Sequence, residues 1–461
     1  MSSFDVFLSE IRKAARLPDR SAPAVTGAGV LPSAYAVTDL AAASFAAAGE
    51  AIATLIAARH DTDPAVSVDR RLASFWYKSS LRPDGWDLPA QWDAVAGDYA
   101  TKDGWIRLHT NAPHHRKAAL ATLGVQDTSK TERADVAKAV ATWNAAELEN
   151  AVVSAGGCAG ELRSSAAWAA HPQGKAVAQE PLLHHETFSG PSPANWEVNR
   201  ARPLDGIRVL DLTRVLAGPT ATRFLAGYGA DVLRIDPPLD LWDEALAEEM
   251  SLGKHSAILD LRKDTDRQRL KELIAEADVM VHGYRGDALE GLGLGASVRR
   301  SFNPGLVDVA LCAYGWTGPW AGRRGFDSIV QMSSGIAETG MRHYGKDKPT
   351  PLPVQALDYA TGFIVATAAV SGLAERVRSG DGSHFRTSLA RIAALLESQK
   401  QNTDAPEFAP ETEADLAPDI EETHWGPARR LASAVTIAGV PASWDIPAGP
   451  IGTAEPVWPL R

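Results

Sequence analysis

The sequence predicts an α/β protein in which a doubly wound parallel β-sheet over residues 203–395 is joined to a smaller α+β domain. Three observations carry this prediction. Residues 203–236 have the pattern strand, helix, strand; short apolar runs alternate with helical patterns up to residue 395; and residues 86–195 are rich in tryptophan and helical patterns, with a few short strands. Strands that alternate with helices of this length indicate parallel βαβ units.

Each element of the predicted sheet has its own signal. A β-rich run at 207–212 is followed by helical spacing over 218–230 and by a second apolar run at 231–236. The alternation continues with predicted strands at 256–261, 278–283 and 307–315 and with a helix at 266–277, where apolar residues recur at helical spacing. Connections between parallel strands place such helices on the two faces of one sheet.

The rest of the chain divides into three parts. Residues 1–85 contain a long Ala-rich segment, 37–58, which predicts a buried helix, and residues 1–30 are expected to be partly loose. Residues 86–195 form the small α+β domain. Residues 396–461 form an acidic linker and tail, because eight acids, three prolines and no Lys or Arg lie between 401 and 422.

The sequence also contains an internal repeat. Residues 31–74 can be aligned with residues 352–391, which places Asp39 opposite Asp358 and Leu72 opposite Leu389 with two residues inserted. Both segments share a Leu-Pro pair, the aspartate, a long apolar helical pattern and a basic ending. A partial duplication is the better interpretation of this match, although two Ala-rich helices could also resemble one another by chance.

Composition excludes several classes of protein. A net charge of −11 argues against a nucleic-acid partner, which requires clustered positive charge. Two cysteines, Cys158 and Cys312, are too few for a disulfide framework or a Cys-built zinc site. The first residues show no signal-peptide pattern and the apolar segment 37–58 contains two acids, so we expect a cytoplasmic protein with no membrane partner.

The common motifs of several enzyme classes are absent. No G-x-G-x-x-G follows the first predicted strand, and the sequence has no phosphate-binding G-x-x-x-x-G-K-[ST] loop, H-E-x-x-H or G-x-S-x-G. His114 and His115 are adjacent but have no nearby carboxylates to complete a metal site, so a surface or packing role is expected for them. The sequence therefore predicts no metal site.

Asp358 is the strongest candidate for a reactive group. It stands where an apolar, strand-like run ends and a long apolar helix begins. The structural interpretation makes Asp358 the N-cap of that helix. The functional interpretation makes it a nucleophile, because a helix N-terminus favours the ionised carboxylate and α/β proteins bind ligands at strand ends. The small neighbour Gly362 would leave room for a ligand.

A second set of candidates follows the other predicted strands. The set comprises Arg214, Arg262, the Gly283-Tyr284-Arg285 turn and Tyr314, which precedes Gly315. Loops at strand ends are commonly polar for structural reasons alone. Several arginines at one edge of a sheet also suit a ligand that carries phosphate.

Residues 203–395 closely resemble the class III CoA-transferases (the CaiB/BaiF type, with formyl-CoA transferase and carnitine CoA-transferase), which share their fold with the α-methylacyl-CoA racemases. Six segments match in the family's order: PLDGIRVLDLTRVLAGPTATRFLAGYGADVLRID, KHSAILDLRK, ADVMVHGYRGDALEGLGLG, NPGLVDVALCAYGWTGPWAGRRGFDSIVQMSSGIAETG, the Asp358 segment and SGDGSHFRTSL. Residues 99–195 are similar to the family's small domain, which normally follows the catalytic half, and 424–444 to its C-terminal segment. The chain is thus expected to combine two partial copies, with Asp39 a degenerate counterpart of Asp358.

The resemblance implies a Rossmann-like CoA-binding domain and a CoA-transferase activity. In the family an aspartate, here Asp358, attacks an acyl-CoA thioester to form a mixed anhydride and then an aspartyl-CoA thioester, from which an acceptor carboxylic acid takes the CoA. The resemblance implies that seven residues lie along the CoA groove: Arg214, Ala217, Arg262, Gly283, Tyr284, Arg285 and Tyr314. It also implies a homodimer and CoA esters as substrates, with no tightly bound cofactor.

Two alternatives stay open at this point. The family's glycine-rich loop over the aspartate has no clear counterpart here and the two halves are rearranged, so a non-catalytic acyl-CoA-binding subunit is one alternative. Leu216 also stands where some members have a polar Gln in the acyl site. The other alternative is an α-methylacyl-CoA racemase. That reaction requires the histidine of a G-H-D motif, and here the motif is Gly325-Phe326-Asp327, whose phenylalanine cannot exchange protons.

Overall fold

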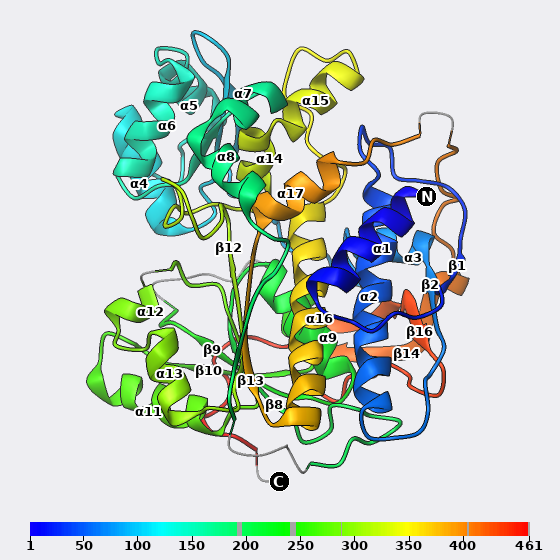
Figure 1. The fold of residues 1–461 in the computed structure, drawn as a ribbon. Helices are drawn as coiled ribbons and strands as arrows, with labels where there is room; N and C mark the ends of the chain where they lie inside the picture. The colour runs from blue at the N-terminus through cyan, green and yellow to red at the C-terminus, as the bar shows by residue number, and fades with distance from the viewer. Residues whose placement is uncertain (191–195, 240–245, 287, 403–404, 460–461) are drawn as a thin grey trace.

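A computed structural model describes residues 1–190, 196–239, 246–286, 288–402 and 405–459, and its centre is one seven-stranded sheet (Figure 1). The strand order is β10-β9-β8-β11-β12-β13-β7, and all neighbours are parallel except β7 beside β13. The strands are β7 (His184–Phe188), β8 (Arg208–Leu212), β9 (Asp231–Asp236), β10 (Lys254–Ile258), β11 (Val279–His282), β12 (Val307–Cys312) and β13 (Gly382–Ser388). The six parallel strands are wound in the Rossmann order, which confirms the predicted fold class.

Helices cover both faces of this sheet because its strands are apolar on both sides. Val209 and Val279 belong to the cluster on one face, and their chain neighbours Leu210 and Met280 belong to the cluster on the other. The first face is covered by α9 (Ala217–Gly227) and α16 (Ala356–Ser379), and the second by α11 (Asp264–Glu276), α12 (Ala288–Gly291) and α13 (Ala296–Phe302) (Figure 1).

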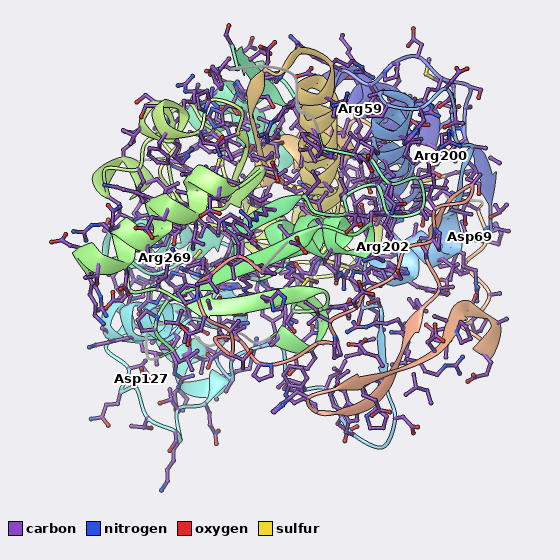
Figure 2. All side chains as sticks on the ribbon, turned by 90° about the horizontal axis from the view of Figure 1, so that it is seen from below. Arg59, Asp69, Asp127, Arg200, Arg202 and Arg269 are labelled. Carbon is purple, nitrogen blue, oxygen red and sulfur yellow. The ribbon has the colours of Figure 1, made fainter. Side chains whose placement is uncertain are left out.

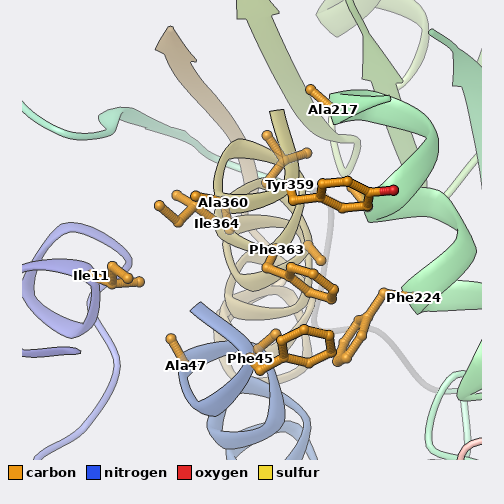
Figure 3. Close-up of a cluster of buried hydrophobic side chains, with 14 of the residues drawn as sticks. Ile11, Phe45, Ala47, Ala217, Phe224, Tyr359, Ala360, Phe363 and Ile364 are labelled. Atoms are coloured by element: carbon orange, nitrogen blue, oxygen red, sulfur yellow. The ribbon is translucent and has the colours of Figure 1, made fainter. Parts of the chain in front are cut away.

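The N-terminal part adds a further layer against α16. It contains α1 (Ser3–Ala14), α2 (Val37–Ala57), α3 (Arg70–Trp76) and a three-stranded sheet of β1 (Ala24–Thr26), β2 (Val66–Asp69) and β16 (Val435–Ile437). Phe45 of α2 lies against Phe363 of α16 with ring centroids 3.8 Å apart (Figure 3). Of residues 1–30, which the sequence predicts to be partly loose, α1 is anchored by Phe7 and Ile11, both completely buried, whereas most of 18–29 is exposed.

Among the described residues, two helices, α2 and α16, are long and apolar enough to cross a membrane. In the structure, however, 94% of the apolar window of α2 and 100% of that of α16 are buried inside the protein. Their apolar surfaces are therefore used in packing between helices, as the sequence predicts for segment 37–58.

The internal repeat is present in three dimensions, but its register differs from the predicted one. A long helix, a strand and a second helix occur in both copies: α2, β2 and α3 in the first, α16, β13 and α17 (Leu389–Glu397) in the second. Asp39 and Asp358 are each the third residue of their helix. Asp39 precedes Asp69, the N-cap of α3, by as many residues as Asp358 precedes Ser388, the N-cap of α17. No insertion is therefore needed, and Arg70 rather than Leu72 corresponds to Leu389.

The small α+β domain is shorter than the predicted range 86–195. Its separate core runs from Val95 to Ala159. It contains β4 (Gly97–Ala100), β5 (Trp105–Leu108), β6 (Ala159–Glu161), α4 (Pro113–Leu123), α5 (Arg133–Val140) and α6 (Ala145–Ser154). The following helices, α7 (Ser165–Ala170) and α8 (Pro172–Gln179), lead to β7, which extends the main sheet. The chain then enters the α/β domain, where α10 (Ala247–Met250), α14 (Asp327–Ser334) and α15 (Ile336–His343) complete the set of helices.

The acidic segment 401–422 is not a solvated linker where the structure describes it. Residues 403–404 lie outside the described part, but a short 3₁₀ turn, Glu413–Asp415, and β14 (Leu416–Thr423) follow, and β14 pairs with β15 (Gly426–Leu431) and through it with β3 (Leu81–Pro83). Glu411 pairs with Arg82 at 2.6 Å and Asp415 with Arg71 at 2.5 Å. The acids therefore serve as partners for arginines of the N-terminal part.

The last residues return to the main sheet instead of forming a free tail. Arg202 pairs with Asp445 at 2.9 Å, and the guanidinium of Arg269 donates to the carbonyl oxygen of Pro456 at 2.7 Å; Figure 2 labels both arginines. Trp458 is buried in the apolar cluster under α11. This segment covers the outer edge of the sheet beside β10.

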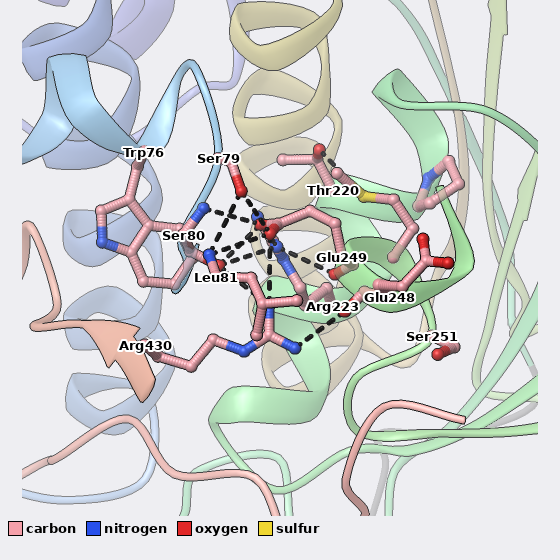
Figure 4. Close-up of polar contacts among 12 residues, drawn as sticks. Trp76, Ser79, Ser80, Leu81, Thr220, Arg223, Glu248, Glu249, Ser251 and Arg430 are labelled. Carbon is pink, nitrogen blue, oxygen red and sulfur yellow. Dashed lines mark hydrogen bonds and ion pairs between the residues drawn. The ribbon is translucent and has the colours of Figure 1, made fainter. Parts of the chain in front are cut away.

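A buried ion-pair network joins the N-terminal part to the α/β domain (Figure 4). The Glu249 carboxylate pairs with Arg223 of α9 and with Arg430 of β15, and it accepts hydrogen bonds from the Ser80 hydroxyl at 2.6 Å and the Leu81 amide at 3.1 Å. Burial opposes ionisation of Glu249, but the two arginines lower its pKa to about 2. Three chain segments that are remote in sequence are thus fixed together beside the N-terminal half of α16.

Candidate active site

Asp358 lies in the first turn of α16, and neither sequence-based placement of it is right in detail. No strand precedes it, because α16 begins at Ala356 after an irregular segment. It is not the N-cap either, since that position is Gln355, whose side chain makes no capping bond. Asp358 is 8% exposed, and the described residues give its carboxyl group no hydrogen-bond partner. A buried carboxyl without a structural task is a candidate for chemistry.

A second carboxylate, Asp327, caps α16 from outside the helix. One Asp327 oxygen accepts from the amide of Leu357 at 2.8 Å and from the amide of Asp358 at 3.0 Å. The other oxygen accepts from the side-chain amide of Gln331, which in turn accepts from the Leu352 amide at 2.7 Å. Asp327 therefore uses two of the free N–H groups at the start of α16 and fixes the backbone that carries Asp358.

The two carboxyl groups make each other harder to ionise. Burial raises the pKa of Asp327 to about 6, in spite of its three hydrogen bonds. Burial, and then the negative charge of Asp327, hold the pKa of Asp358 well above its ordinary value. Ionisation of one carboxyl therefore opposes ionisation of the other, because two close carboxylates in a buried site repel each other.

The turn after β8 approaches Asp358 in a strained conformation. Val215 has φ of +68°, a left-handed conformation that is rare for a β-branched residue and costs on the order of 1–3 kcal/mol. Asp211, the last residue but one of β8, supports this turn by accepting from the Thr213 amide at 2.9 Å and the Lys254 ammonium at 3.1 Å. Strain that is held by a buried network is typical of a functional turn.

Two cavities meet at Asp358. Asp358, Val215 and Phe326 line both of them. The larger, of about 870 Å³, opens along the carboxyl ends of the parallel strands; the smaller, of about 270 Å³, lies between the α/β domain, the N-terminal part and the small domain. The carboxyl ends of the strands are where doubly wound sheets bind ligands.

Six of the seven predicted groove residues line the larger cavity together: Arg214, Ala217, Arg262, Gly283, Tyr284 and Arg285. The guanidinium of Arg214 lies over the Tyr284 ring at 5.8 Å from its centroid. Cationic side chains outnumber acidic ones in this lining, with Lys117, Arg214, Arg262, Arg285, Arg323 and Arg324 against Asp236, Asp260 and Asp358. Such a surface suits a ligand with several phosphates.

Tyr314 is not part of this lining. Its side chain is fully buried, its hydroxyl lies 2.9 Å from that of Ser333, and its ring packs against Trp320. The predicted space at Gly362 is also occupied, because a Cβ there would lie 2.6 Å from the Ala217 carbonyl oxygen. Gly362 thus lets α16 pack closely on α9 and leaves no room for a ligand.

Several residues of the smaller cavity have no signal in the sequence. Besides Asp327, they include His109 and Trp92, which are contributed by the region before and within the small domain. The His109 ring stacks on Phe326 with centroids 3.7 Å apart, so an imidazole lies beside the phenylalanine of the G-F-D motif. Burial, followed by the charge of His115, lowers the pKa of His109 to about 3, and a base this weak does not favour proton abstraction from an acyl α-carbon.

The histidine pair of the small domain has the surface and packing positions expected for it, with His114 exposed and the His115 ring against that of Phe326. His114 and His115 line the larger cavity opposite the strand ends, and His115 is buried with neither ring nitrogen hydrogen-bonded within the described residues. In the described part of the chain, no group of three or more His, Cys, Asp or Glu residues is placed to hold a metal ion.

The α/β domain thus has a cationic groove at its strand ends and a buried carboxyl at the inner end of that groove, an arrangement suited to a ligand that carries phosphate. Residues 204–422 match CoA-transferase family III. This match confirms the resemblance to that family that the motifs of residues 203–395 predict.

Individual relatives cover a similar range. Acetyl-coenzyme A transferase nodX of Hypoxylon pulicicidum is 32% identical over 315 residues, which are 64% of this chain and 53% of the relative. The succinyl-CoA:glutarate CoA-transferase of Homo sapiens is 30% identical over 214 residues, 43% of this chain and 48% of the relative. A crystal structure of a CAIB/BAIF family protein from Brucella suis is 28% identical, with a TM-score of 0.40 over 50% of this chain and 65% of that chain. The chain spans about half the length of the curated relatives it matches.

Proposed function

We propose that this protein is an acyl-CoA:carboxylate CoA-transferase that uses Asp358 as its nucleophile. The single observation that carries the proposal is the meeting of two unlike cavities at Asp358: a long cationic groove along the strand ends and a small, largely apolar cavity. The groove is suited to the phosphates and pantetheine of CoA. The small cavity is suited to the acyl group, and the thioester would then lie against the carboxyl of Asp358.

In the first half of the proposed reaction, an ionised Asp358 oxygen attacks the thioester carbonyl carbon. A C–O bond forms, the C–S bond breaks, and CoA leaves as a thiolate, which gives a mixed anhydride. The thiolate then attacks the aspartyl carbonyl carbon, forms an aspartyl-CoA thioester and releases the first acid as its carboxylate. The exchange is thus divided into two nucleophilic steps while CoA stays bound.

The second half runs through the same steps in reverse with a new acid. The acceptor carboxylate attacks the aspartyl thioester and expels the CoA thiolate, which leaves a new mixed anhydride. The thiolate attacks the acyl carbon of the acceptor, and the Asp358 carboxylate is regenerated. Atoms and charge balance over the cycle, so no metal or redox cofactor is required, and the substrates are a CoA ester and a carboxylic acid.

The proposed role of Asp327 is to position Asp358 and to hold it in its protonated, unreactive form until substrate binds. The amide bonds to Asp327 fix the first turn of α16, and its charge raises the pKa of Asp358. The proton on Asp358 must leave before attack, so the proposed reaction becomes faster as the pH rises.

Hydroxylamine trapping tests the assignment directly. The protein is incubated with acetyl-CoA, butyryl-CoA or succinyl-CoA and hydroxylamine, and peptides are examined by mass spectrometry. A hydroxamate at Asp358 is the expected result, because hydroxylamine intercepts an activated aspartyl carbonyl. CoA-ester binding in calorimetry without any hydroxamate would instead favour the non-catalytic acyl-CoA-binding subunit. Deuterium entry at the acyl α-carbon would favour the racemase.

A homodimer and a cytoplasmic location remain part of the proposal. The dimer derives from the family resemblance, and the location stays a prediction from the sequence. Sedimentation of the full chain and fractionation of the producing cell would test them.

A further inference from the structure

The smaller cavity has a chemical character that limits which acids it can take. Its walls are mainly apolar and aromatic: Tyr77, Leu88, Pro89, Trp92, Val215, Leu216, Leu246, Phe326, Pro353, Val354 and Tyr359. The volume of about 270 Å³ lies just below the range of about 300–1,000 Å³ that is usual for drug-sized ligands. The cavity is therefore suited to a compact acyl group with an apolar or aromatic body.

The charged groups of this cavity are nearly all acidic. Glu248, Glu249, Asp327 and Asp358 belong to its lining, and among the described residues Lys78 is the one cationic side chain there. Lys78 is exposed.

Arginines near the cavity have other partners. Arg223 and Arg430 both pair with Glu249, and neither belongs to the lining. Arg107 lies over the Trp92 ring at 5.0 Å from its centroid and pairs with Asp98 at 2.7 Å. A second carboxylate on a bound acid would therefore enter a space where the described residues place acidic side chains and no buried cation to receive it, which is strongly unfavourable.

We infer that this protein transfers CoA to and from monocarboxylic acids with a compact apolar or aromatic body and discriminates against dicarboxylic acids. The inference rests on the proposed function and sharpens it. The inferred preference differs from that of relatives whose names specify succinate and glutarate. In this chain, the end of the acyl group that points away from Asp358 would contact apolar and acidic side chains.

Isotope exchange between an acid and its own CoA ester tests the inference with one acid at a time, so the natural donor and acceptor need not be identified. Succinate and 4-methylpentanoate form a matched pair, since an isopropyl group replaces a carboxylate of similar shape. For the full chain, exchange of labelled 4-methylpentanoate into 4-methylpentanoyl-CoA is expected to exceed that of succinate into succinyl-CoA by on the order of 100-fold in kcat/KM. Equal or faster exchange of succinate would overturn the inference and leave the proposed function intact.

Two variants locate the selectivity in this cavity. Leu88 lines it and is 38% exposed, so Leu88→Arg can add a cation at its rim, and we expect the preference against succinate to fall at least about tenfold. Leu88→Met is the uncharged control and is expected to keep the preference. If Lys78→Met selectively abolished succinate exchange, Lys78 would be the missing counter-charge and the inference would be wrong.

Calorimetry distinguishes failure of the inference from failure of the proposed function. If neither acid exchanges, the transferase proposal fails. Tighter binding of 4-methylpentanoyl-CoA than of succinyl-CoA would still support the assigned character of the cavity, and the opposite order of affinities would refute it.

Discussion

Each copy of the repeat places an aspartate at the third position of its long helix. The side chains around the two aspartates differ in charge. Residues 36 and 355, which precede the two helices, have almost the same backbone angles, with φ of −75° in both and ψ of 58° and 63°. In α2 the Asp39 carboxylate pairs with Arg70 at 2.6 Å. In α16 the corresponding Asp358 faces another carboxylate, Asp327, and two cavities.

One substitution accounts for much of this difference. Arg70 follows the N-cap of α3 just as Leu389 follows the N-cap of α17, and Leu389 lines the larger cavity together with Asp358. A cation at this position neutralises the aspartate in the first copy. A leucine leaves it uncompensated in the second. The backbone of the repeat thus provides the position of the carboxyl, and the residue after the following strand decides whether a cation pairs with it.

The largest expected effect comes from exchanging the two aspartates for asparagine one at a time. Asp358→Asn should lower acyl exchange by on the order of 10⁴-fold or more, as expected for loss of a covalent nucleophile, with CoA binding largely kept. Asp39→Asn is the matched control in the other copy and should leave the rate within about twofold, since Arg70 and not substrate contacts Asp39. Parallel exchange rates and calorimetric CoA affinities check both, and equal losses in the two variants would refute the distinction.

A second test introduces the cation of the first copy, Arg70, at the corresponding position of the second copy, Leu389. Leu389→Arg should place a guanidinium beside Asp358, stabilise its ionised form as an ion pair and obstruct the cavity, so that exchange falls at least about tenfold. Leu389→Met keeps the size without the charge and should retain most of the rate. An unchanged rate in a correctly folded Leu389→Arg variant would show that the residue after the strand does not control Asp358.

The sheet could be predicted from the sequence because its signals are local. Each strand of the parallel set is a short apolar run followed by helical spacing, and the predictions of the strand that ends at Leu212 and the helix that ends at Glu276 agree with the structure within a few residues. The strand expected before Asp358 is wrong because an apolar run of this length can also begin a buried helix. The expectation for the acidic segment is wrong because its partners, such as Arg71 and Arg82, lie far away in the sequence.

The site could be predicted only in part. The groove residues are predictable because the loops after parallel strands converge at one edge of the sheet. In the sequence Asp327 is recognisable only as the last residue of the Gly325-Phe326-Asp327 motif. Its role as a cap of α16 could not be predicted, because the amide it caps lies 30 residues further along the chain. His109 and Trp92 line the smaller cavity because the small domain packs against the α/β domain, which no local pattern predicts. Tyr314 does not line the groove, because its ring packs against Trp320 instead.

The third prediction concerns the charge of Asp327, which raises the pKa of Asp358 in the second copy. Asp327→Asn keeps an oxygen that can accept from the amides of α16 but removes the charge that raises the pKa of Asp358. The pKa of Asp358 should fall, so the acid limb of the pH–rate profile should move to lower pH by about one unit. Rates from pH 5 to 9 check this. A shift to higher pH, or a uniform loss of rate at every pH, would contradict the proposed influence of Asp327.

The smallest effect is on stability, and it differs between the two copies. Because burial and Asp327 raise the pKa of Asp358, the folded protein keeps a proton that the unfolded chain loses above the ordinary pKa of 3.8. The contribution of Asp358 to the stability of the folded protein therefore falls as the pH rises from 3.8 to the raised pKa of Asp358. Asp358→Asn removes this unfavourable contribution and should raise the melting temperature at pH 7 by a few degrees, with no gain below pH 3.8. Burial also raises the pKa of Asp39, but Arg70 opposes it, so Asp39→Asn should change the melting temperature less. Thermal unfolding of both variants at pH 7 and at pH 3.5 decides this, and a lower melting temperature for Asp358→Asn at pH 7 would mean that its carboxylate is stabilised in the folded protein.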